Sequence, residues 1–346
     1  MYLALETSCD DTCAAVLSPE GHPLSSIVSS QLIHGEYEGV VPELASREHL
    51  RLGLTTIRLA LEQAGCGLDA VRGVAVTQGP GLVGCLLVGL GLAKGLALAR
   101  RVPVVGVNHI EGHLHAIRAE QAWEPPFVAL VASGGHTELL HVENWGRYEL
   151  LGATRDDAAG EAFDKIAKLL GLGYPGGAIV DRLARDGRKD AYTFPRAYMD
   201  VGSGNLDVSF SGLKTAVKLF LERDADWAGG RATDRFVADV CASFQAALVD
   251  VLIAKIEAAV ARTAAPRVLL SGGVACNSYL RQRAVALGER CGVRVAYPSP
   301  QLCADNAVMI GLAGLAGLQA GKDDGMTLTA LPNLDDFLAF AGRWSL

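Results

Sequence analysis

Two histidines four positions apart are the residues whose type and spacing best suit chemistry. His109 and His113 stand in the segment NHIEGH. On a helix, residues four apart share one face, so both imidazoles can bind the same metal ion. A zinc protease has a glutamate directly after the first histidine, and this segment has isoleucine there. The spacing therefore favours a metal site of another kind; the alternative is a helix that carries two histidines without a metal.

A third metal ligand has to come from elsewhere in the chain, and Asp305 is the best candidate. It stands in the segment LCADN, after Pro298 and Pro300 and before an apolar run that ends near Leu318. Two histidines and one carboxylate would leave coordination positions open for a substrate. The alternative is that Asp305 only caps the helix that the apolar run predicts.

Two glycine-rich segments are typical of turns that bind phosphate. SGGHT begins at Ser133 between two apolar runs, and SGGVACN begins at Ser271 between an apolar run and a predicted helix. Glycines allow backbone N–H groups to approach phosphate oxygens closely. Asn277 ends the second segment with an amide that could reach an adenine or a ribose. The alternative for each segment is a tight turn without a ligand.

The elements that must position these residues alternate between strands and helices. Periodicity predicts a helix over 45–64 with Leu50, Leu54, Ile57 and Leu61 on one face. Apolar runs predict strands over residues 2–6, 13–17, 73–76, 102–107, 127–132, 138–142 and 267–270. Such alternation implies a mostly parallel sheet, and the strand at 102–107 runs straight into His109.

The two halves of the chain repeat one plan of strand, polar turn and strand. A duplicated α/β fold of this kind predicts an actin-like ATPase architecture of two domains, with a nucleotide in the cleft between them. We expect an N-terminal domain over 1–125, on which a C-terminal helix over about 305–346 packs back, and a second domain over 126–304. Residues 152–220 form a helical insert whose first helix, over 158–170, would be capped by Asp156 or Asp157.

Composition narrows the class of protein. The chain has 346 residues and a net charge of −7, which argues against binding nucleic acid by general basicity. The start MYLALETSCDD lacks a signal-peptide pattern, and the eight cysteines include no CxxC pair, so we expect a reducing cytoplasm. The apolar segment 79–99 is long enough for a membrane span, but it contains Lys94 and several glycines, which favour a buried helix.

Eight segments in a fixed order closely resemble the TsaD family, the bacterial tRNA adenosine threonylcarbamoyltransferases formerly labelled O-sialoglycoprotein endopeptidases. The segments are ALETSCDDT, GPGLVGCLLVG, NHIEGH, SGGHTEL, DDAAGEAFDKIAKLLGLGYPGG, FSGLKTA, SGGVACN and CADN. The resemblance covers about residues 2–318. It implies the actin-like fold shared by sugar kinases and heat-shock ATPases. It also implies transfer of the threonylcarbamoyl group of threonylcarbamoyl-AMP to N6 of adenosine 37, in tRNAs that read codons beginning with A, with release of AMP.

The resemblance also implies site residues. It assigns one divalent metal, most often Fe²⁺ with Zn²⁺ possible, to His109, His113 and Asp305. It assigns substrate contacts to Val131, Ala132, Ser133, Gly134, Gly135, Asp164, Gly177, Asp181 and Asn277. Many members of the family have glutamate where this chain has Asp11, whose side chain is one methylene shorter. A catalytic role for Asp11 as the proton acceptor is therefore a hypothesis.

The implied partners are tRNA, a TsaB-like paralogue and a TsaE-like ATPase, with a cytoplasmic location and no membrane. Arg182, Arg185, Arg188 and Lys189 would contribute to tRNA contact, or would form only a solvated charged helix face. Two other functions compete. A metalloprotease would need the adjacent glutamate that is missing, and an actin-like kinase or ATPase would hold Mg²⁺ through phosphates rather than imidazoles.

Overall fold

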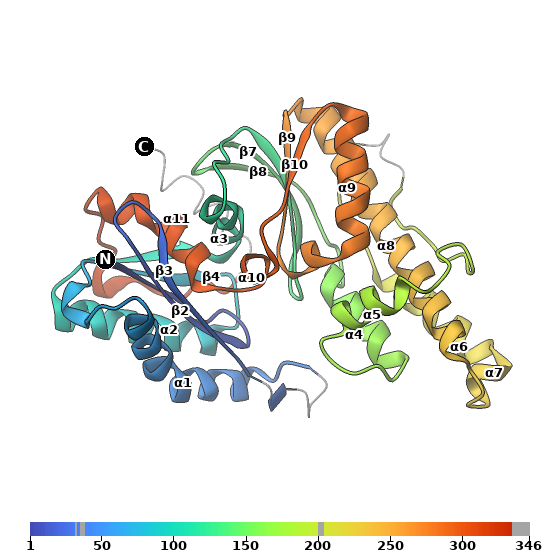
Figure 1. Ribbon diagram of the computed structural model, residues 1–346, viewed down its shortest axis with the longest axis horizontal. Coiled ribbons are helices and arrows are strands. Elements are labelled where there is room, and N and C mark those ends of the chain that lie inside the picture. The colour runs from blue at the N-terminus through green and yellow to red at the C-terminus, as the bar shows by residue number, and fades with distance from the viewer. Residues whose placement is uncertain (32, 35–38, 200–203, 334–346) are drawn as a thin grey trace. The chain divides into compact units, whose positions relative to one another are not determined.

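The structure is a computed structural model that describes residues 1–31, 33–34, 39–199 and 204–333. The chain divides into two compact units. Unit 1 comprises Met1–Trp123, Trp145–Arg147 and Ala304–Leu346, and unit 2 comprises Glu124–Asn144 and Tyr148–Cys303. Each unit is built around one five-stranded sheet (Figure 1).

The sheet of unit 1 has the order β3-β2-β1-β4-β5. Its strands are β1 (Tyr2–Glu6), β2 (Asp11–Leu17), β3 (Pro23–Ser30), β4 (Val74–Gly79) and β5 (Val104–Asn108). β1, β2 and β3 pair antiparallel, whereas β1, β4 and β5 pair parallel. The predicted strands at 2–6, 13–17, 73–76 and 102–107 therefore exist, and β3 was not predicted.

Both faces of this sheet are covered by helices (Figure 1). Helices α1 (Pro42–Gln63) and α2 (Val83–Arg100) share one hydrophobic cluster with Leu3, Leu5, Val74 and Val76. Helix α11 (Ala307–Gln319) lies on the opposite face, where Gly311 and Gly314 bring its backbone against Ala4 and Ala75. Because strand side chains alternate between faces, near-continuous apolar runs are what a sheet covered on both sides requires.

The predicted inner face of the helix at 45–64 was partly wrong. Ile57 and Leu61 are buried as expected, but Leu50 and Leu54 are 68% and 65% exposed. The buried positions include Ala45, His49, Gly53, Thr56 and Ala60 instead. The helix therefore has apolar residues on two faces, one packed in the core and one directed outward. The sequence pattern alone does not show which apolar residues lie on which face.

The sheet of unit 2 repeats the plan in the order β10-β9-β6-β7-β8. Its strands are β6 (Phe127–Ala132), β7 (Thr137–Asn144), β8 (Arg147–Ala153), β9 (Arg267–Ser271) and β10 (Arg294–Ala296). β6 pairs antiparallel with β7 and parallel with β9, as β1 does with β2 and β4. The expected duplication is therefore present strand by strand.

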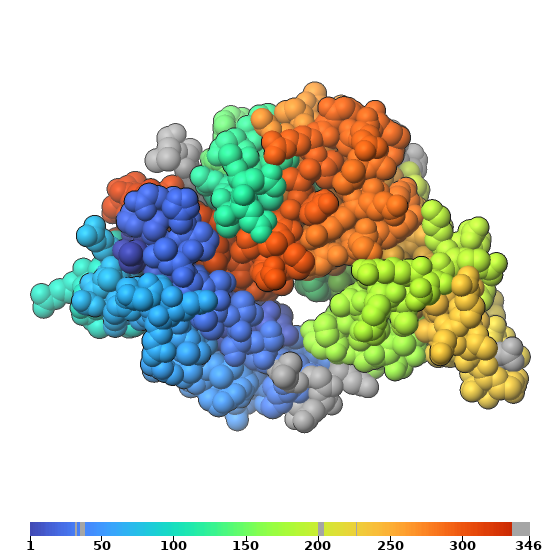
Figure 2. Space-filling view, in the orientation of Figure 1, coloured from blue at the N-terminus to red at the C-terminus, as the bar shows by residue number. Residues whose placement is uncertain are grey.

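The helices of unit 2 surround α8 (Asp234–Thr263), which is buried along most of its length. The others are α4 (Ala159–Leu169), α5 (Gly176–Ala184), α6 (Ser211–Arg223), α7 (Ala225–Ala228), α9 (Ser278–Cys291) and α10 (Pro300–Cys303). α5 and α9 both pack on α8, and α6 and α7 lie at the periphery of the unit (Figure 2, yellow).

Two predicted helix boundaries need correction. Neither Asp156 nor Asp157 caps α4, whose N-cap is Ala158. Asp156 instead accepts hydrogen bonds from the backbone N–H groups of Phe210 and Ser211, at the start of α6. The predicted helix over 305–346 is helical over Ala307–Gln319, and residues 334–346 lie outside the described part of the chain.

Among the described residues, α2 and α8 are long and apolar enough to cross a membrane by length and composition alone. In α8, 83% of the apolar window is buried, as in the core helix of a globular domain. In α2 the buried share is 33%, because one face packs on the sheet and Val83 and Leu87 face outward. The predicted helix is present over Val83–Arg100, after the turn that follows Gly79, but it is buried on one face only.

Candidate metal centre

Helix α3 (His109–His115) carries two of the three predicted metal ligands and begins directly at the end of β5. Asn108 is its N-cap: the side-chain oxygen accepts hydrogen bonds from Ile110 N at 2.8 Å and Glu111 N at 3.2 Å. This cap satisfies two of the N–H groups that a helix start leaves without partners. It also fixes the first turn, so His109 and His113 leave the helix on the same side.

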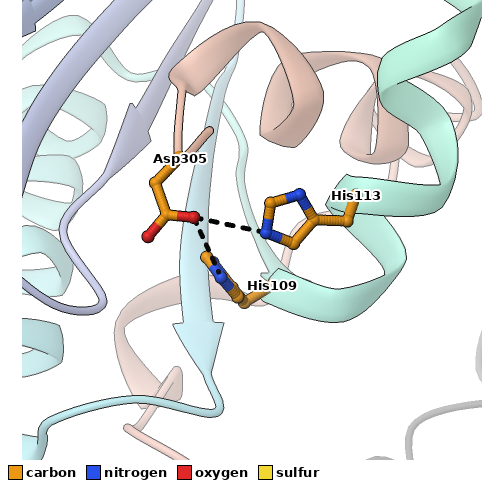
Figure 3. A group of neighbouring side chains, drawn as sticks. All are labelled: His109, His113 and Asp305. Carbon is orange, nitrogen blue, oxygen red and sulfur yellow. Dashed lines mark ion pairs between the residues drawn. The ribbon is translucent and has the colours of Figure 1, made fainter. Parts of the chain in front are cut away.

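Figure 3 shows the two imidazoles directed at Asp305, which lies in the loop before α11. Asp305 Oδ1 lies 3.5 Å from His109 Nε2 and 3.2 Å from His113 Nε2. The three ligand atoms lie within 4.8 Å of one another. His109 and His113 are 3% and 0% exposed, and the Asp305 side chain is 22% exposed. The site is thus closed on the histidine side and reached by solvent at the aspartate.

Asp305 faces the histidines, and its neighbour Asn306 caps the following helix. Asn306 is the N-cap of α11, and its side-chain oxygen accepts a hydrogen bond from Met309 N at 3.0 Å. The alternative interpretation of Asp305 as the helix cap was therefore wrong. The Cys13 thiol donates to the backbone carbonyl of Asp305 at 3.6 Å and ties this loop to β2.

Glu6, at the end of β1, is a candidate site residue that the sequence analysis missed. One of its carboxylate oxygens lies 3.0 Å from His109 Nδ1 and also accepts a hydrogen bond from the Thr77 hydroxyl. The other accepts from Ser8 N. A carboxylate only accepts, so Nδ1 carries a hydrogen toward Glu6, and Nε2, on the Asp305 side, is the ring nitrogen available to a metal. A carboxylate behind a ligating histidine is the usual support of a metal site.

The charges around the site suit a cation. Burial raises the pKa of Glu6, but the opposite charge and hydrogen bond of His109 outweigh burial and hold that pKa below its usual range. Burial lowers the pKa of His113, which keeps its imidazole neutral and able to bind a metal. Two imidazole nitrogens and one carboxylate are a ligand set that suits Fe²⁺, Zn²⁺ or Mn²⁺. The residues present therefore fit the expected divalent metal.

Replacing Glu6 by glutamine should weaken metal binding without removing a ligand. The change deletes the negative charge that fixes the His109 tautomer, and outer-shell changes of this kind cost about 10–100-fold in metal affinity. Competition with a chromophoric chelator measures the affinity. Glu62→Gln, at an exposed glutamate of α1, is the matched control. Equal affinities of Glu6→Gln and wild type, within about twofold, would contradict the assigned role.

Asp11, the candidate proton acceptor, is the first residue of β2 and belongs to the same unit as the metal ligands. Burial raises the pKa of Asp11 to about 7, and the negative charges of Asp305, Asp10 and Glu6 add to this rise against a hydrogen bond from Ser30. A carboxylate with a pKa near neutrality can both take up and release a proton at physiological pH.

The predicted substrate residues all lie in unit 2. Val131 and Ala132 are buried at the end of β6. Ser133 is committed to its own turn: its N–H donates to the carbonyl of His136, and its hydroxyl accepts from His136 N. At Gly134 and Gly135 a side chain would meet open space, so the outer surface of this turn is accessible.

Three of the predicted substrate residues make hydrogen bonds at the first residues of helices α5 and α9. Asp164 Oδ1 accepts a hydrogen bond from Gly176 N at 2.8 Å, at the start of α5, beside Gly177. Asp181 Oδ1 accepts from the backbone N and the hydroxyl of Ser278, at the start of α9.

Asn277 is the N-cap of α9, and its amide nitrogen donates to Gln245 at 2.7 Å. Asp164 thus holds the start of α5, Asp181 joins α5 to the start of α9, and Asn277 joins that start to α8.

A second group of possible ligands, His141, Glu143 and Glu149, lies on β7 and β8. Glu149 is 45% exposed, and its carboxylate pairs with Arg262 at 2.9 Å. His141 Nδ1 lies 3.8 Å from the other oxygen of Glu149. This group is a surface ion-pair cluster, in contrast to the buried centre at His109.

Solved structures with a similar fold are distant in sequence. HypF of T. kodakarensis superposes with a TM-score of 0.61 at 15% identity, covering 92% of this chain and 48% of that one. Full-length HypF in its phosphate- and nucleotide-bound form gives a TM-score of 0.59, and this chain spans 47% of its length. Component A of the Acidaminococcus fermentans (R)-2-hydroxyglutaryl-CoA dehydratase gives 0.53 at 15% identity, covering 92% and 98%. These likenesses confirm the two-domain actin-like α/β fold.

Relatives at the level of sequence are close and nearly full length. The family model of TsaD, tRNA N6-adenosine threonylcarbamoyltransferase, matches residues 22–312. A protein of that name from Geotalea uraniireducens is 53% identical over 96% of this chain and 95% of its own. Others from Geobacter sulfurreducens and Clostridium perfringens are 51% and 49% identical, over 99% and 96% of this chain and 99% and 97% of their own. The chain therefore belongs to the TsaD family of tRNA N6-adenosine threonylcarbamoyltransferases, which are acyltransferases.

Proposed function

We propose that the chain transfers the threonylcarbamoyl group from threonylcarbamoyl-AMP to N6 of adenosine 37 in tRNAs that read codons beginning with A, and releases AMP. The observation that carries this proposal is the convergence of His109, His113 and Asp305, backed by Glu6, in a chain of the TsaD family. The threonylcarbamoyl donor is a mixed anhydride that is already activated. The protein therefore has no need of a covalent nucleophile; it has to bind, orient and deprotonate.

In unit 1, His109, His113 and Asp305 would hold the divalent metal, for which Fe²⁺ and Zn²⁺ are the leading candidates. When bound, the metal supplies Lewis-acid stabilisation of negative charge on the acyl donor. Asp11 accepts the proton that the adenosine amine loses as its nitrogen attacks the carbamoyl carbon. The raised pKa of Asp11 matches this task, because a proton acceptor works best when its pKa lies near the operating pH.

In unit 2, the turn at 133–135 would bind the phosphate of the donor. Ser133 N is already bonded to His136, so the amides of Gly134 and Gly135 are the candidate donors, and a Cβ at either glycine would meet open space. Glycine allows an anion to approach the backbone there without a Cβ in the way. Val131 and Ala132 lead the chain into this turn. Asp164, Gly177, Asp181 and Asn277 shape the adjoining surface through the starts of α5 and α9.

A reconstituted reaction tests the proposed function directly. The full chain is mixed with tRNA, threonylcarbamoyl-AMP and the purified partner proteins, and threonylcarbamoyl-adenosine and AMP are quantified by mass spectrometry. We expect both products in equal amounts. Peptide cleavage or sugar phosphorylation in place of the modified nucleoside would favour the protease or kinase alternative. An HExxH protease has its glutamate directly after the first histidine, whereas Glu111 lies two positions after His109. This spacing counts against the protease alternative.

The proposed partners besides tRNA are a TsaB-like paralogue and a TsaE-like ATPase, in the cytoplasm where tRNA is modified. For tRNA, Arg182 and Lys189 are exposed on and beyond α5, whereas Arg185 and Arg188 form ion pairs with Asp181 and Asp239. These pairs reduce the positive charge that Arg185 and Arg188 can offer to a phosphate. Arg182 and Lys189, rather than the ion-paired Arg185 and Arg188, are therefore expected to contact the tRNA backbone.

We propose that the TsaB-like paralogue docks on an apolar surface of α1 and α2. α1 lies at the surface of unit 1 (Figure 2). A Cβ at Gly84 would lie 3.2 Å from Ser46, and one at Gly53 would collide with Leu92, so the two helices run side by side in this register. Leu50, between Ser46 and Gly53, therefore neighbours Leu87, which is 56% exposed. Contiguous exposed leucines of this kind mark protein interfaces.

The double substitution Leu50→Asp and Leu54→Asp should weaken binding of the paralogue about 30-fold or more, because two buried interface anchors cost roughly 2 kcal/mol or more. Isothermal titration calorimetry with the purified paralogue measures this loss. Leu219→Asp, at a leucine of α6 that is 42% exposed, is the matched control and should bind normally. If the double variant binds as tightly as the control, the paralogue docks elsewhere.

A further inference from the structure

His49 is a fully buried histidine whose two ring nitrogens both contact the segment that carries Asp11. It lies on the inner face of α1 and is 0% exposed. Its Nδ1 is 2.8 Å from the Thr12 hydroxyl, and its Nε2 is 2.9 Å from the carbonyl oxygen of Cys9. The two contacts hold the chain on both sides of Asp10 and Asp11.

The partners define the protonation state of His49. A carbonyl oxygen only accepts, so Nε2 carries the hydrogen and donates it to Cys9, and Nδ1 accepts from the Thr12 hydroxyl. Burial lowers the pKa of His49 below its usual range, which agrees with a neutral ring. A leucine could fill the same space without the desolvation of two polar nitrogens. The imidazole is therefore present for its hydrogen bonds rather than for its bulk.

The other supports of this turn come from different elements. Thr7 donates its hydroxyl hydrogen to the Cys85 carbonyl on α2 at 3.0 Å, and Leu82 N donates to the Ser8 carbonyl at 2.8 Å. Gln31 N, just after β3, donates to the Asp10 carbonyl at 3.2 Å. His49 adds two bonds from α1, one on each side of Asp11. Its loss would leave the residues before and after the candidate proton acceptor without this support.

We propose that His49 is a positioning residue for the transfer reaction: its paired hydrogen bonds to Cys9 and Thr12 hold the Asp11 carboxylate where it accepts the proton of the attacking amine. The inference rests on the proposed function and on the role of Asp11 within it. His49 touches neither the substrate nor the metal ligands in this assignment and acts through the backbone of the turn.

Kinetics of His49→Leu and His49→Gln test the proposal in the reconstituted reaction. A glutamine can donate from its amide nitrogen to Cys9 and accept at its oxygen from Thr12, whereas leucine can do neither. We expect His49→Leu to lower kcat about 10–100-fold, with KM for threonylcarbamoyl-AMP changed by less than about twofold, because a small misplacement of a reacting group costs this much. His49→Gln should recover most of the loss. Metal content should stay at the wild-type value in both variants.

His22→Leu, at an exposed histidine of unit 1, makes the same chemical change outside the turn and should leave kcat unchanged. A kcat of His49→Leu within about twofold of wild type would overturn the proposal, as would a loss in His49→Gln equal to that in His49→Leu. If His49→Leu does not fold, Thr12→Val removes one of the two bonds and should lower kcat about 3–10-fold; an unchanged kcat in that variant also overturns it. An inactive wild type would instead reject the proposed function.

Discussion

Replacing His113 by alanine is expected to abolish stoichiometric metal binding and to lower threonylcarbamoyl transfer by about 10³-fold or more. His113 supplies one of three ligand atoms that lie within 4.8 Å of one another, and its ring is wholly buried at 3.2 Å from Asp305. Lewis-acid stabilisation is worth several kcal/mol, and each 1.36 kcal/mol changes a rate about tenfold. Metal content by plasma mass spectrometry and the initial rate of modified-adenosine formation are the two measurements.

The same prediction can be tested without a mutation in the core. A strong chelator should remove both the metal and the activity from wild type, and Fe²⁺ or Zn²⁺ added back should restore both. His22→Ala is the control for the loss of a histidine as such, since His22 is exposed and lies outside the site. Full transfer activity in metal-free protein would contradict the assignment of the centre, whatever the behaviour of the variant.

The sequence predicted the position of the histidines well because their placement depends on local structure. The apolar run of β5 and the i,i+4 spacing define where His109 and His113 leave the chain. The role of Asp305 depended on which of two adjacent residues caps α11, and Asn306 does so. Asparagine and aspartate are about equally good caps, so propensity alone could not decide between them.

Glu6 could not be predicted from local pattern, because its partner His109 lies 103 positions away. The available signal was a carboxylate at the end of an otherwise apolar strand, where burial demands a partner. The predicted inner face of α1 was partly wrong because the local pattern there was ambiguous. Leu50 and Leu54 match a helical core pattern as well as Ile57 does, and only the observed packing assigns them to the surface.

The interpretation of Asp164, Asp181 and Asn277 is also sharper with the structure. Resemblance assigns them to substrate, whereas the hydrogen bonds of this chain place them at the starts of α5 and α9. Both roles are compatible for the two aspartates, since a carboxylate has about four acceptor positions, and Asn277 has a second amide hydrogen besides the one bonded to Gln245. Such residues fix the orientation of two helices, and a sequence motif does not distinguish that task from direct contact with a ligand.

Asp11→Asn is expected to lower kcat for transfer by about 10²–10⁴-fold, the usual contribution of a positioned proton acceptor. Asparagine keeps the size of the side chain and its hydrogen bond from Ser30, but it cannot take up a proton. tRNA affinity and metal content should match those of wild type, which separates loss of chemistry from loss of binding. Asp11→Glu, which restores the carboxylate, should recover a large part of the rate.

The pH profile gives the sharper test of Asp11. A proton acceptor must be ionised, so the wild-type rate should rise with pH as Asp11 loses its proton, near its raised pKa of about 7. The charge of Asp305 contributes to that raised pKa, and a bound cation would offset this charge, so the rise should fall at or somewhat below pH 7 in the metal-loaded protein. The residual rate of Asp11→Asn should lack this rise. If Asp11→Asn kept the wild-type profile and rate, another group would take the proton, and the positioning assigned to His49 would have no carboxylate to act on.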